Sequence, residues 1–471
     1  MANRSLRNSV SFWFRSVAVT VAVVLPAAAT AFCREKPNIV FVLVDDLGWM
    51  DLACQGNKLI DTPNIDGFAK QGMRFTDAYS AAPVCSPTRA AIMTGQSPAR
   101  LHLTTHIPDR FVPRNAEWLP AATLNHLPLR HVTIAERLKQ AGYATAFMGK
   151  WHLAGRCQSG GKTLEKTEFY PERQGFDINL GGCHLGGPPT YFDPYRIENL
   201  PNRRRGEYLP DRLADEAAAF MRAGRRKPFF LCLWHYTVHW PMEAKKQMLE
   251  KYAARKGPGL NDHRYGAMVE CMDAAFGGIL ATLDELNLTG RTLVIFTSDN
   301  GGFSGVADNR PLRAGKGYLY EGGIRVPLIV RWPGIVPPGA VCREPVLSTD
   351  FYPTLLAAAG LRPDPNVPLD GENLMPLLRQ SGRLARREIY FHFPNYAWHM
   401  QNRLGAVVRE GPLKLIQHYD DGSVQLYNLV DDLGESSDLS AQMPDKAAEL
   451  KRKLQAWLAA SGAEMPKRRE P

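Results

Sequence analysis

The stretch Asn38-Ile39-Val40-Phe41-Val42-Leu43-Val44-Asp45-Asp46 is a continuous apolar run that ends in two carboxylates. Its β-branched side chains and its lack of polar alternation are typical of a strand buried on both faces of a parallel sheet. Ligands of open α/β sheets bind beyond the carboxyl ends of the strands, so Asp45 and Asp46 are candidate site residues. Taken alone, an Asp-Asp pair after a strand is more often a turn or a helix cap.

Three further apolar runs end in polar residues in the same way: Thr292–Thr297 precedes Asp299 and Asn300, Phe229–Trp234 precedes His235 and His239, and Tyr143–Met148 precedes Lys150 and His152. Helical patterns lie between the runs, over Thr133–Ala141 and Tyr265–Leu286. This alternation predicts an α/β fold with a large central, mostly parallel sheet flanked by helices. Four polar strand ends at one edge of a sheet are hard to explain as loops alone.

The side chains of Asp45, Asp46, Asp299 and Asn300 offer only oxygen atoms as ligands. Such a set favours a hard cation, calcium or magnesium. Without a cation, three clustered carboxylates would repel one another and raise one another's pKa. The sequence therefore predicts a divalent metal site at this edge of the sheet.

The most specific stretch of the chain surrounds Cys85 and runs from Pro83 to Gly95. Pro87 suits the first turn of a helix, which places Cys85 at the helix N-terminus, where the helix dipole favours an anion. Arg89 follows four residues later and faces the same side. Read in isolation, the pattern is more often a buried cysteine ahead of a helix.

Cys85-Ser86-Pro87-Thr88-Arg89 resembles the C-x-P-x-R signature of the type I, formylglycine-dependent sulfatases, which are arylsulfatase-like members of the alkaline phosphatase superfamily. Three other stretches are similar to motifs of this family: Gly142–His152, Gly315–Pro327 and Leu426–Leu429. The resemblance extends in order from about residue 37 to 440 and implies an alkaline phosphatase-like fold.

The resemblance also implies the site and its cofactors. A separate maturation enzyme would oxidise Cys85 to formylglycine, and one calcium ion would bind to Asp45, Asp46, Asp299, Asn300 and the modified Cys85. Arg89 would hold the formylglycine hydrate. Lys150, His152, His239 and Lys316 would surround the sulfate, with Lys150, His239 and Lys316 binding the substrate.

The activity implied is hydrolysis of sulfate esters. Calcium, Arg89, Lys150 and Lys316 would offset the negative charge of the ester. One hydroxyl of the hydrate would attack sulfur, and His239, with or without Lys316, would protonate the leaving alcohol. His152 would then deprotonate the second hydroxyl so that sulfate is expelled.

Residues 1–31 have the pattern of a signal peptide. Arg4, Arg7 and Arg15 precede the apolar run Val17–Pro26, and Ala29-Thr30-Ala31 fits an A-x-A cleavage site. The apolar run is shorter than the ~20 residues of a spanning helix, so no stable membrane span is expected. We expect an exported protein, periplasmic or secreted. Membrane anchoring is the alternative, and lipidation at Cys33 is weaker because bulky Phe32 precedes it.

The net charge indicates which binding partners to expect, and the cysteine spacing indicates which disulfides are possible. The net charge of +10 falls to +7 when the three arginines of residues 1–31 are removed. A basic surface would attract a polyanion such as a sulfated glycan. No zinc-finger or aromatic RNA-binding motif is present, so nucleic acid is not an expected partner. The eight cysteines form no C-x-x-C pair, and an exported chain could form one or two bridges among Cys54, Cys157, Cys183, Cys232, Cys271 and Cys342.

The length of 471 residues exceeds what one hydrophobic core usually carries. We expect a catalytic domain over residues 32–382, with a strand at Ile324–Arg331 and a closing helix at Thr349–Ala359. Residues 383–471 are expected to form a small antiparallel sheet and one helix, followed by a frayed tail at Lys467-Arg468-Arg469. The expected elements are the strands Glu388–Phe393, Gly405–Arg409, Lys414–His418 and Ser423–Tyr427 and a helix from Pro444 to Ala460.

Two other functions are compatible with the resemblance. Phosphate and phosphonate ester hydrolases of the superfamily often hold two metals or use histidine ligands, whereas here the ligands are oxygen-only and lysines are near. A glycan-binding pseudo-sulfatase would have no need of Lys150, His152, His239 and Lys316 together. Export and basic charge favour a sulfated carbohydrate over an aryl sulfate as substrate. His102, His106, His184, His392 and Trp398 are candidates for a sugar subsite, and His235 is expected only to shape the pocket or to pack.

Overall fold

The computed structural model describes residues 36–108, 111–159, 162–223, 227–399 and 401–470, together with Met1 and Ser11. The chain divides into two units, Met1–Glu35 and Lys36–Pro471. The second unit contains every helix and strand considered below. The expected signal peptide and Cys33 lie outside the described residues, apart from Met1 and Ser11, so the export prediction stays a prediction.

The second unit is built around an eight-stranded sheet with the order β12-β2-β11-β10-β1-β9-β5-β8. Strands β10, β1, β9, β5 and β8 are parallel, while β11 is antiparallel to both of its neighbours. The strands are β1 (Asn38–Val44), β2 (Met73–Phe75), β5 (Ala144–Gly149), β8 (Ile178–Leu180), β9 (Phe229–Trp234), β10 (Thr292–Ser298), β11 (Leu328–Arg331) and β12 (Ala340–Cys342). The predicted α/β fold with a mostly parallel central sheet is confirmed.

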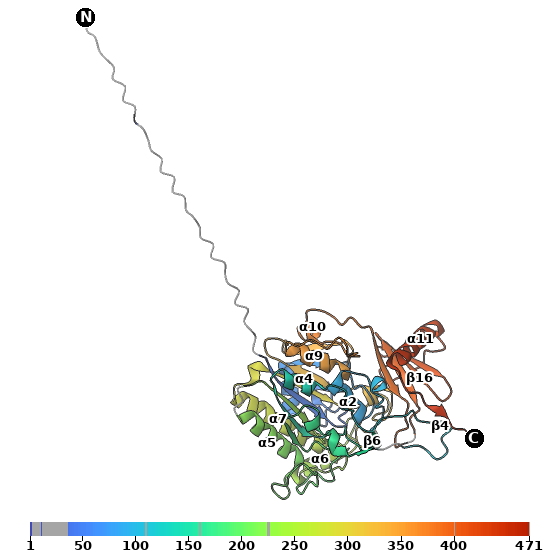
Figure 1. Cartoon of the computed structure of the whole chain (residues 1–471), viewed down its shortest axis with the longest axis horizontal. Helices are drawn as coiled ribbons and strands as arrows, with labels where there is room; N and C mark the ends of the chain where they lie inside the picture. Colours follow the sequence, from blue (N-terminus) through green and yellow to red (C-terminus); the bar gives the residue numbers. More distant parts are fainter. Residues whose placement is uncertain are drawn as a thin grey trace. The chain divides into compact units, whose positions relative to one another are not determined.

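Helices cover both faces of this sheet, which explains why every residue of β1 is buried. Figure 1 shows α2 (Cys85–Thr94), α4 (Ile134–Gln140) and α9 (Phe351–Ala358) on one side and α5 (Leu209–Arg222) and α7 (His263–Glu285) on the other. Among the described residues, α7 is long and apolar enough to cross a membrane, but 67% of its apolar window is buried inside the protein, as in a core helix.

Shorter elements complete this part of the chain. They are α1 (Pro63–Gln71), α3 (Pro98–Leu101), α6 (Lys246–Ala253), α8 (Glu321–Ile324), α10 (Met375–Leu378), and the strand pairs β3 (Ala78–Tyr79) with β13 (Val346–Leu347) and β6 (Cys157–Ser159) with β7 (Lys162–Leu164).

The prediction of a strand over Ile324–Arg331 is wrong for the first half of this range. Residues Glu321–Ile324 form the helical turn α8, and the strand begins only at Leu328. Pro327 has no N–H to donate to a neighbouring strand, so the ladder cannot extend across it. The apolar pattern of this segment alone does not reveal that limit.

A second, four-stranded antiparallel sheet has the order β14-β15-β16-β17 and is covered by α11 (Pro444–Ser461). Its strands are β14 (Glu388–Phe393), β15 (Gly405–Glu410), β16 (Leu413–His418) and β17 (Val424–Asn428). Because side chains alternate along a strand, one face contacts α11 through Val408 and Leu415. The opposite face, including Val407 and Ile416, contacts the α/β part of the chain. The predicted boundary between residues 382 and 383 stays a prediction.

The end of the chain is ordered rather than frayed, which corrects the prediction for Lys467-Arg468-Arg469. Lys467–Arg468 form β18 and pair with β4 (Trp118–Leu119). The Arg469 amide also donates to the Glu117 carbonyl at 2.7 Å. Backbone hydrogen bonds order these residues, and their charged side chains gave no indication of this pairing in the sequence.

The one or two disulfides that an exported chain could form are not present in the part of the chain that the structure describes. Among the residues that the structure describes, the seven cysteines other than Cys33 are all free.

Candidate active site

Four neighbouring strands deliver the predicted site residues to one edge of the central sheet. Val44 pairs with Ser298, so Asp45 and Asp46 lie beside Asp299 and Asn300. Gly149 pairs with Trp234, which brings the segments after β5 and β9 to the same edge. The first turn of α2 adds Cys85. The structure therefore brings together all the residues predicted from the strand ends and from the Cys85 segment, and their chemical roles stay predictions.

The turn after β1 has an unusual backbone. Asp46 has φ of 62°, the left-handed region that non-glycine residues seldom occupy. Its carbonyl accepts a hydrogen bond from the Tyr265 hydroxyl at 3.1 Å, and its amide donates to Asp299 Oδ1 at 3.2 Å. Tyr265 in turn donates to the buried carboxylate of Asp51, which also accepts from the Gly48 amide at 2.5 Å. These contacts fix the turn so that two successive carboxylates reach the site.

Each of the three site carboxylates has a buried cationic partner. Lys150 Nζ donates to Asp45 Oδ2 at 2.6 Å, and Arg89 lies 2.7 Å from Asp299 Oδ2. Lys316 Nζ lies 2.7 and 2.8 Å from the two oxygens of Asp46. Pairing of this quality is needed because isolated charges are very costly to bury.

The pairing leaves a deficit of positive charge around Asp45. Burial raises the pKa of Asp45 well above its usual range even though Lys150 opposes the rise, and Asp299 and Asp46 add to it. For Asp46, burial acts in the same direction, but Lys316, His239 and Lys150 lower the pKa below its usual range. A further positive charge near Asp45 would keep it ionised.

The donor atoms at this point fit a hard divalent cation. One ligand atom each from Asp45, Cys85 and Asp299 lies within 4.8 Å of the other two. Asp45 Oδ1 and Asn300 Oδ1 are buried without a hydrogen-bond partner. Buried polar atoms normally have a partner, so two orphaned oxygens beside a carboxylate cluster indicate that an ion belongs there.

Cys85 is the first residue of α2, and 2% of it is exposed. Burial raises the pKa of its thiol, although Lys150 and Lys316 oppose the rise. The helix terminus therefore does not produce the thiolate that its dipole would favour. Arg89 lies one turn further along α2 and donates to the Lys150 carbonyl at 2.5 Å.

His152 is held as a neutral imidazole. Burial, with Lys150, lowers its pKa well below the ordinary value. Its Nε2 faces the Ile107 carbonyl, which can only accept, so Nε2 carries the hydrogen and the unpartnered Nδ1 is free to take a proton. Ser86 fixes this segment, because its hydroxyl donates to the His152 carbonyl at 2.8 Å and accepts from the Ile107 amide at 3.1 Å.

His239 is oriented by its own neighbours. Its Nδ1 lies 3.0 Å from the Trp240 carbonyl, and its Nε2 lies 3.9 Å from Asp46 Oδ2. Burial and Lys316 lower its pKa to about 3, although Asp46 opposes the drop. His235, by contrast, is buried away from the cavity lining, as expected of a residue that only fills space.

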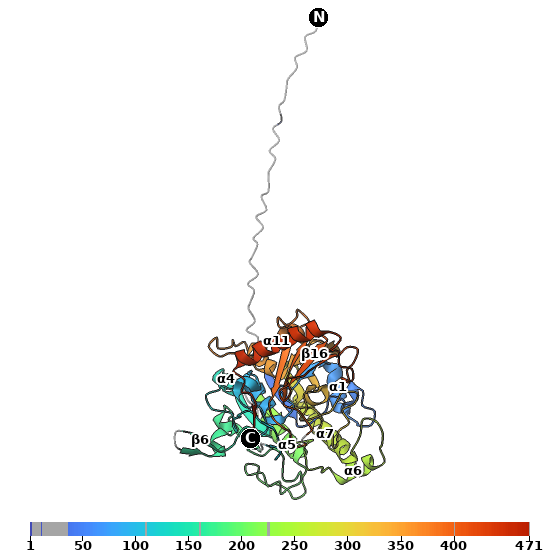
Figure 2. The same ribbon diagram turned by 90° about the vertical axis from the view of Figure 1, so that its right-hand side faces the viewer.

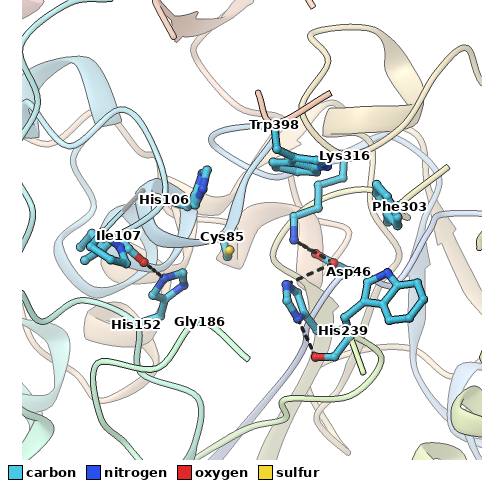
Figure 3. A pocket seen from close by; sticks show the side chains of 12 residues that line it. Asp46, Cys85, His106, Ile107, His152, Gly186, His239, Phe303, Lys316 and Trp398 are labelled. Carbon is cyan, nitrogen blue, oxygen red and sulfur yellow. Dashed lines mark hydrogen bonds and ion pairs between the residues drawn. The ribbon is translucent and has the colours of Figure 1, made fainter. Parts of the chain in front are cut away.

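Of these groups, Asp46, Cys85, His152, His239 and Lys316 line a cavity of about 360 Å³, shown in Figure 3. Its lining comprises Asp46, Cys85, His106, Ile107, Pro108, His152, Gly186, His239, Trp240, Phe303, Lys316 and Trp398. Of the five candidates for a sugar subsite, His106 and Trp398 line it, whereas His102, His184 and His392 do not. Trp398 comes from the loop between β14 and β15, so the C-terminal sheet contributes to the cavity.

Sequence reasoning missed Trp240, Phe303 and Gly186 as lining residues. A signal was available for two of them, since Trp240 follows His239 directly and Phe303 closes the segment that begins at Asp299. For Gly186 the reason is steric. A Cβ there would lie 2.8 Å from the ring of His152, so only glycine lets this loop approach.

A sheet edge with three carboxylates, a helix-terminal cysteine and buried lysines matches the site that the resemblance to hydrolases of the alkaline phosphatase superfamily implies. Residues 37–361 match the family model described as Sulfatase, and residues 314–462 match that of the C-terminal region of N-sulphoglucosamine sulphohydrolase. The chain belongs to the sulfatase family and is a sulfuric ester hydrolase, as the sequence motifs predict.

Individual relatives agree with this assignment. The chain is 32% identical to a sulfatase of Formosa agariphila over 91% of this chain and 90% of that protein. It is 36% identical to human arylsulfatase A over 79% and 74% of the two chains. Among solved structures, Ps i-CgsB in complex with k-i-k-neocarrahexaose matches with a TM-score of 0.76 and 30% identity, covering 90% of this chain and 93% of that one. A phosphonate monoester hydrolase of Agrobacterium radiobacter, 18% identical with a TM-score of 0.69, shares the fold.

The hydrogen bond from Tyr265 to the Asp46 turn yields a prediction. Tyr265→Phe should weaken binding of a divalent cation about tenfold or more, because the Asp46 carbonyl and the Asp51 carboxylate both lose the hydroxyl that orients the turn. Calorimetric titration of metal-stripped protein with calcium measures the change. Tyr252→Phe is the matched control, since that buried hydroxyl accepts from the Asp61 amide instead. Equal calcium affinity in both variants would show that the turn does not depend on Tyr265.

Proposed function

We propose that this sulfatase hydrolyses sulfate esters of carbohydrates, using a formylglycine made from Cys85 and one calcium ion. Asp45, Asp46, Asp299 and Asn300 would hold the ion. The observation that carries the proposal is the position of Cys85. Its sulfur lies within 4.8 Å of ligand oxygens of Asp45 and Asp299, on the floor of a cavity with Lys316 and three histidines around it. A maturation enzyme that recognises the Cys85–Arg89 signature would be the partner in biogenesis.

The charges around the cavity suit a sulfate group. Lys316 faces the cavity, and its pKa lies above the usual range because Asp46 and Cys85 outweigh the effect of burial, so the ammonium is charged. Lys150 and Arg89 lie deeper, against Asp45 and Asp299. When bound, calcium would add fixed positive charge that offsets both the carboxylates and the ester. Lys316 then binds the sulfate oxygens, while Arg89 orients position 85.

Proton transfer is assigned to groups on two sides of Cys85 (Figure 3). The hydrated aldehyde would supply two hydroxyls, one to attack sulfur and one whose deprotonation releases sulfate. His152 is suited to accept that second proton, because its Nδ1 is unprotonated and unpartnered. On the other side, His239 and Lys316 both lie at Asp46, and we assign protonation of the leaving alcohol to this pair. The charged ammonium of Lys316 is the source of the proton, because the lowered pKa of His239 leaves its imidazole neutral.

The aromatic residues in the wall of the cavity are evidence that the leaving group contains a ring. Trp398 lies with its ring centre 6.0 Å from Phe303 and 5.7 Å from His106, and Lys316 Nζ lies 5.3 Å from the centre of the Trp398 ring. A ring joined to a sulfate at Lys316 would therefore meet Trp398 first. Aromatic walls with few polar groups bind the apolar faces of ligands. The neocarrahexaose bound to Ps i-CgsB supports a carbohydrate as that ligand.

Export is part of the proposal, on the basic start and short apolar run of residues 1–31. The mature protein should begin near Phe32 and be found outside the cytoplasm. N-terminal sequencing of the exported protein checks this, and a sequence that starts at Met1 or Ala2 would rule out cleavage.

Cys85 should be converted to formylglycine in a host that has the maturation enzyme. Mass spectrometry of the tryptic peptide that ends at Arg89 should show loss of sulfur and gain of oxygen at position 85. Cys85→Ala should fold but lose turnover of an aryl sulfate, because no nucleophile remains, and Cys85→Ser should stop after one turnover. Full activity from protein whose Cys85 is entirely an unmodified thiol would refute the mechanism.

Trp398→Ala should raise KM for a sulfated oligosaccharide about tenfold, because a loss of about 1.4 kcal/mol of ring contact corresponds to that factor. The effect on kcat should be smaller, since the charged groups on the cavity floor are untouched. Trp457→Ala is the control, because Trp457, on α11, stacks on Tyr390 of β14 and does not line the cavity. Steady-state kinetics that follow the formation of the desulfated product measure KM and kcat for both variants. An unchanged KM in Trp398→Ala would remove the support for a stacked sugar ring.

A further inference from the structure

A buried charge network joins the α/β part of the chain to the C-terminal sheet, and the proposed mechanism does not use it. It contains three carboxylates, three cations and one tyrosine hydroxyl: Asp77, Glu321, Glu435, Arg325, Arg409, Lys414 and Tyr79. We refer to these seven residues as the interface network. Glu321, Lys414 and Glu435 are fully buried.

The centre of the network is a lysine shared by two carboxylates. Lys414, on β16, donates to Glu321 Oε1 at 2.9 Å and lies 2.8 Å from Glu435 Oε1. Glu435 also accepts from the backbone amide of Glu321 at 2.7 Å. The C-terminal part of the chain therefore holds Glu321 both by its side chain and by its backbone.

The other oxygen of Glu321 is held by the α/β part. Glu321 Oε2 accepts from the Tyr79 hydroxyl at 2.6 Å and from Arg325 at 3.1 Å. Although burial would raise the pKa of Glu321, Lys414, Arg325 and Arg409 lower it to about 2, so this carboxylate is ionised. Every oxygen of Glu321 thus has a charged or hydroxyl partner.

Glu321 begins α8, and the backbone of α8 contacts the active-site segments. The Gly323 carbonyl accepts from the Gly301 amide at 3.0 Å, directly after Asn300. The approach is so close that a Cβ on Gly301 would lie 1.8 Å from the Gly322 carbonyl oxygen. On the other side, the Gly322 amide donates to the Arg313 carbonyl at 2.9 Å, which closes the loop that carries Lys316.

The middle of that loop is also fixed, against the segments that follow Asn300 and precede Cys85. The Lys316 amide donates to the Gly302 carbonyl at 3.0 Å, and the Gly317 amide donates to the Pro83 carbonyl at 2.8 Å, two residues before Cys85. A shift of α8 would move Lys316, Asn300 and the Cys85 segment relative to one another. Buried ion networks are not in general a source of stability, whereas they can specify one arrangement of the parts that they join.

We propose that Lys414 and Glu435 are positioning residues of the sulfatase reaction, which hold α8 so that Lys316 and Asn300 keep their places beside Cys85. The proposal rests on the proposed function, because it takes the roles of Lys316 and Asn300 from it. It makes the C-terminal sheet a functional part of the site through its inner face, in addition to the Trp398 loop.

The test compares variants on the two faces of the same sheet. Lys414→Met removes the shared cation, and Glu435→Gln keeps the side-chain length but replaces the carboxyl group with a neutral amide. We expect kcat/KM for an aryl sulfate to fall about 10- to 100-fold in Lys414→Met, because misplacement by about 1 Å can cost that much. Calcium affinity of the metal-stripped protein should fall in parallel, because Asn300 moves with α8. Lys414→Arg keeps the cation and should restore much of both quantities.

Leu450→Ala is the matched control. Leu450 lies in α11 on the outer face of the sheet and contacts none of the network, yet its loss leaves a cavity that should lower Tm by about 5 °C. At an assay temperature well below Tm it should keep calcium affinity and kcat/KM near those of the wild type. If Lys414→Met does not fold, the same comparison is made with Glu435→Gln, for which we expect a fall of about tenfold.

Two results would overturn the proposal. One is wild-type calcium affinity and kcat/KM in the folded network variants. The other is an equal loss in Leu450→Ala, which would mean that activity simply follows the stability of the sheet. Failure of the proposed function is a separate outcome, because it appears in the wild-type protein as an unmodified Cys85 or as no release of sulfate from any sulfated carbohydrate.

Discussion

Compensation of negative charge at one edge of the sheet is the constraint on which the site depends. Asp45, Asp46 and Asp299 approach one another in a buried space, where unpaired carboxylates could not remain ionised. The compensating positive charges come from Lys150, Lys316 and Arg89, each in a different segment of the chain. Because these segments are far apart in sequence, the site exists only when the register of β1, β5, β9 and β10 is correct.

The same constraint explains why a small C-terminal sheet matters to a reaction at the far larger one. Its outer face is covered by α11, and its inner face meets α8 with charged as well as apolar side chains. One loop of the sheet also brings Trp398 over the cavity. The two sheets are therefore separate in topology, but both contribute residues to the proposed active site.

The parts of the fold that sequence predicts well are those whose signal is local. β1, β9 and β14 run between the predicted residues, because continuous burial or strict alternation leaves a clear pattern. The wrong strand start at Ile324 has a local cause, Pro327, whereas the other errors arise where a long-range contact decides. Lys467–Arg468 are ordered by pairing with β4, where the partner of Arg468 is Trp118, 350 residues earlier. Trp398 could not be separated from surface aromatics, because its place over Lys316 depends on how two sheets meet.

The burial of Cys85 constrains the order in which the chain is synthesised, modified and folded. The lysine that closes over it, Lys316, is synthesised 231 residues later, which at ribosomal rates is roughly ten seconds or more. Once β10 has joined β1 and Lys316 has reached Asp46, almost none of Cys85 is accessible. Any chemistry performed on this sulfur by another protein must therefore precede folding, and the wide sequence separation between the strands is what keeps that interval open.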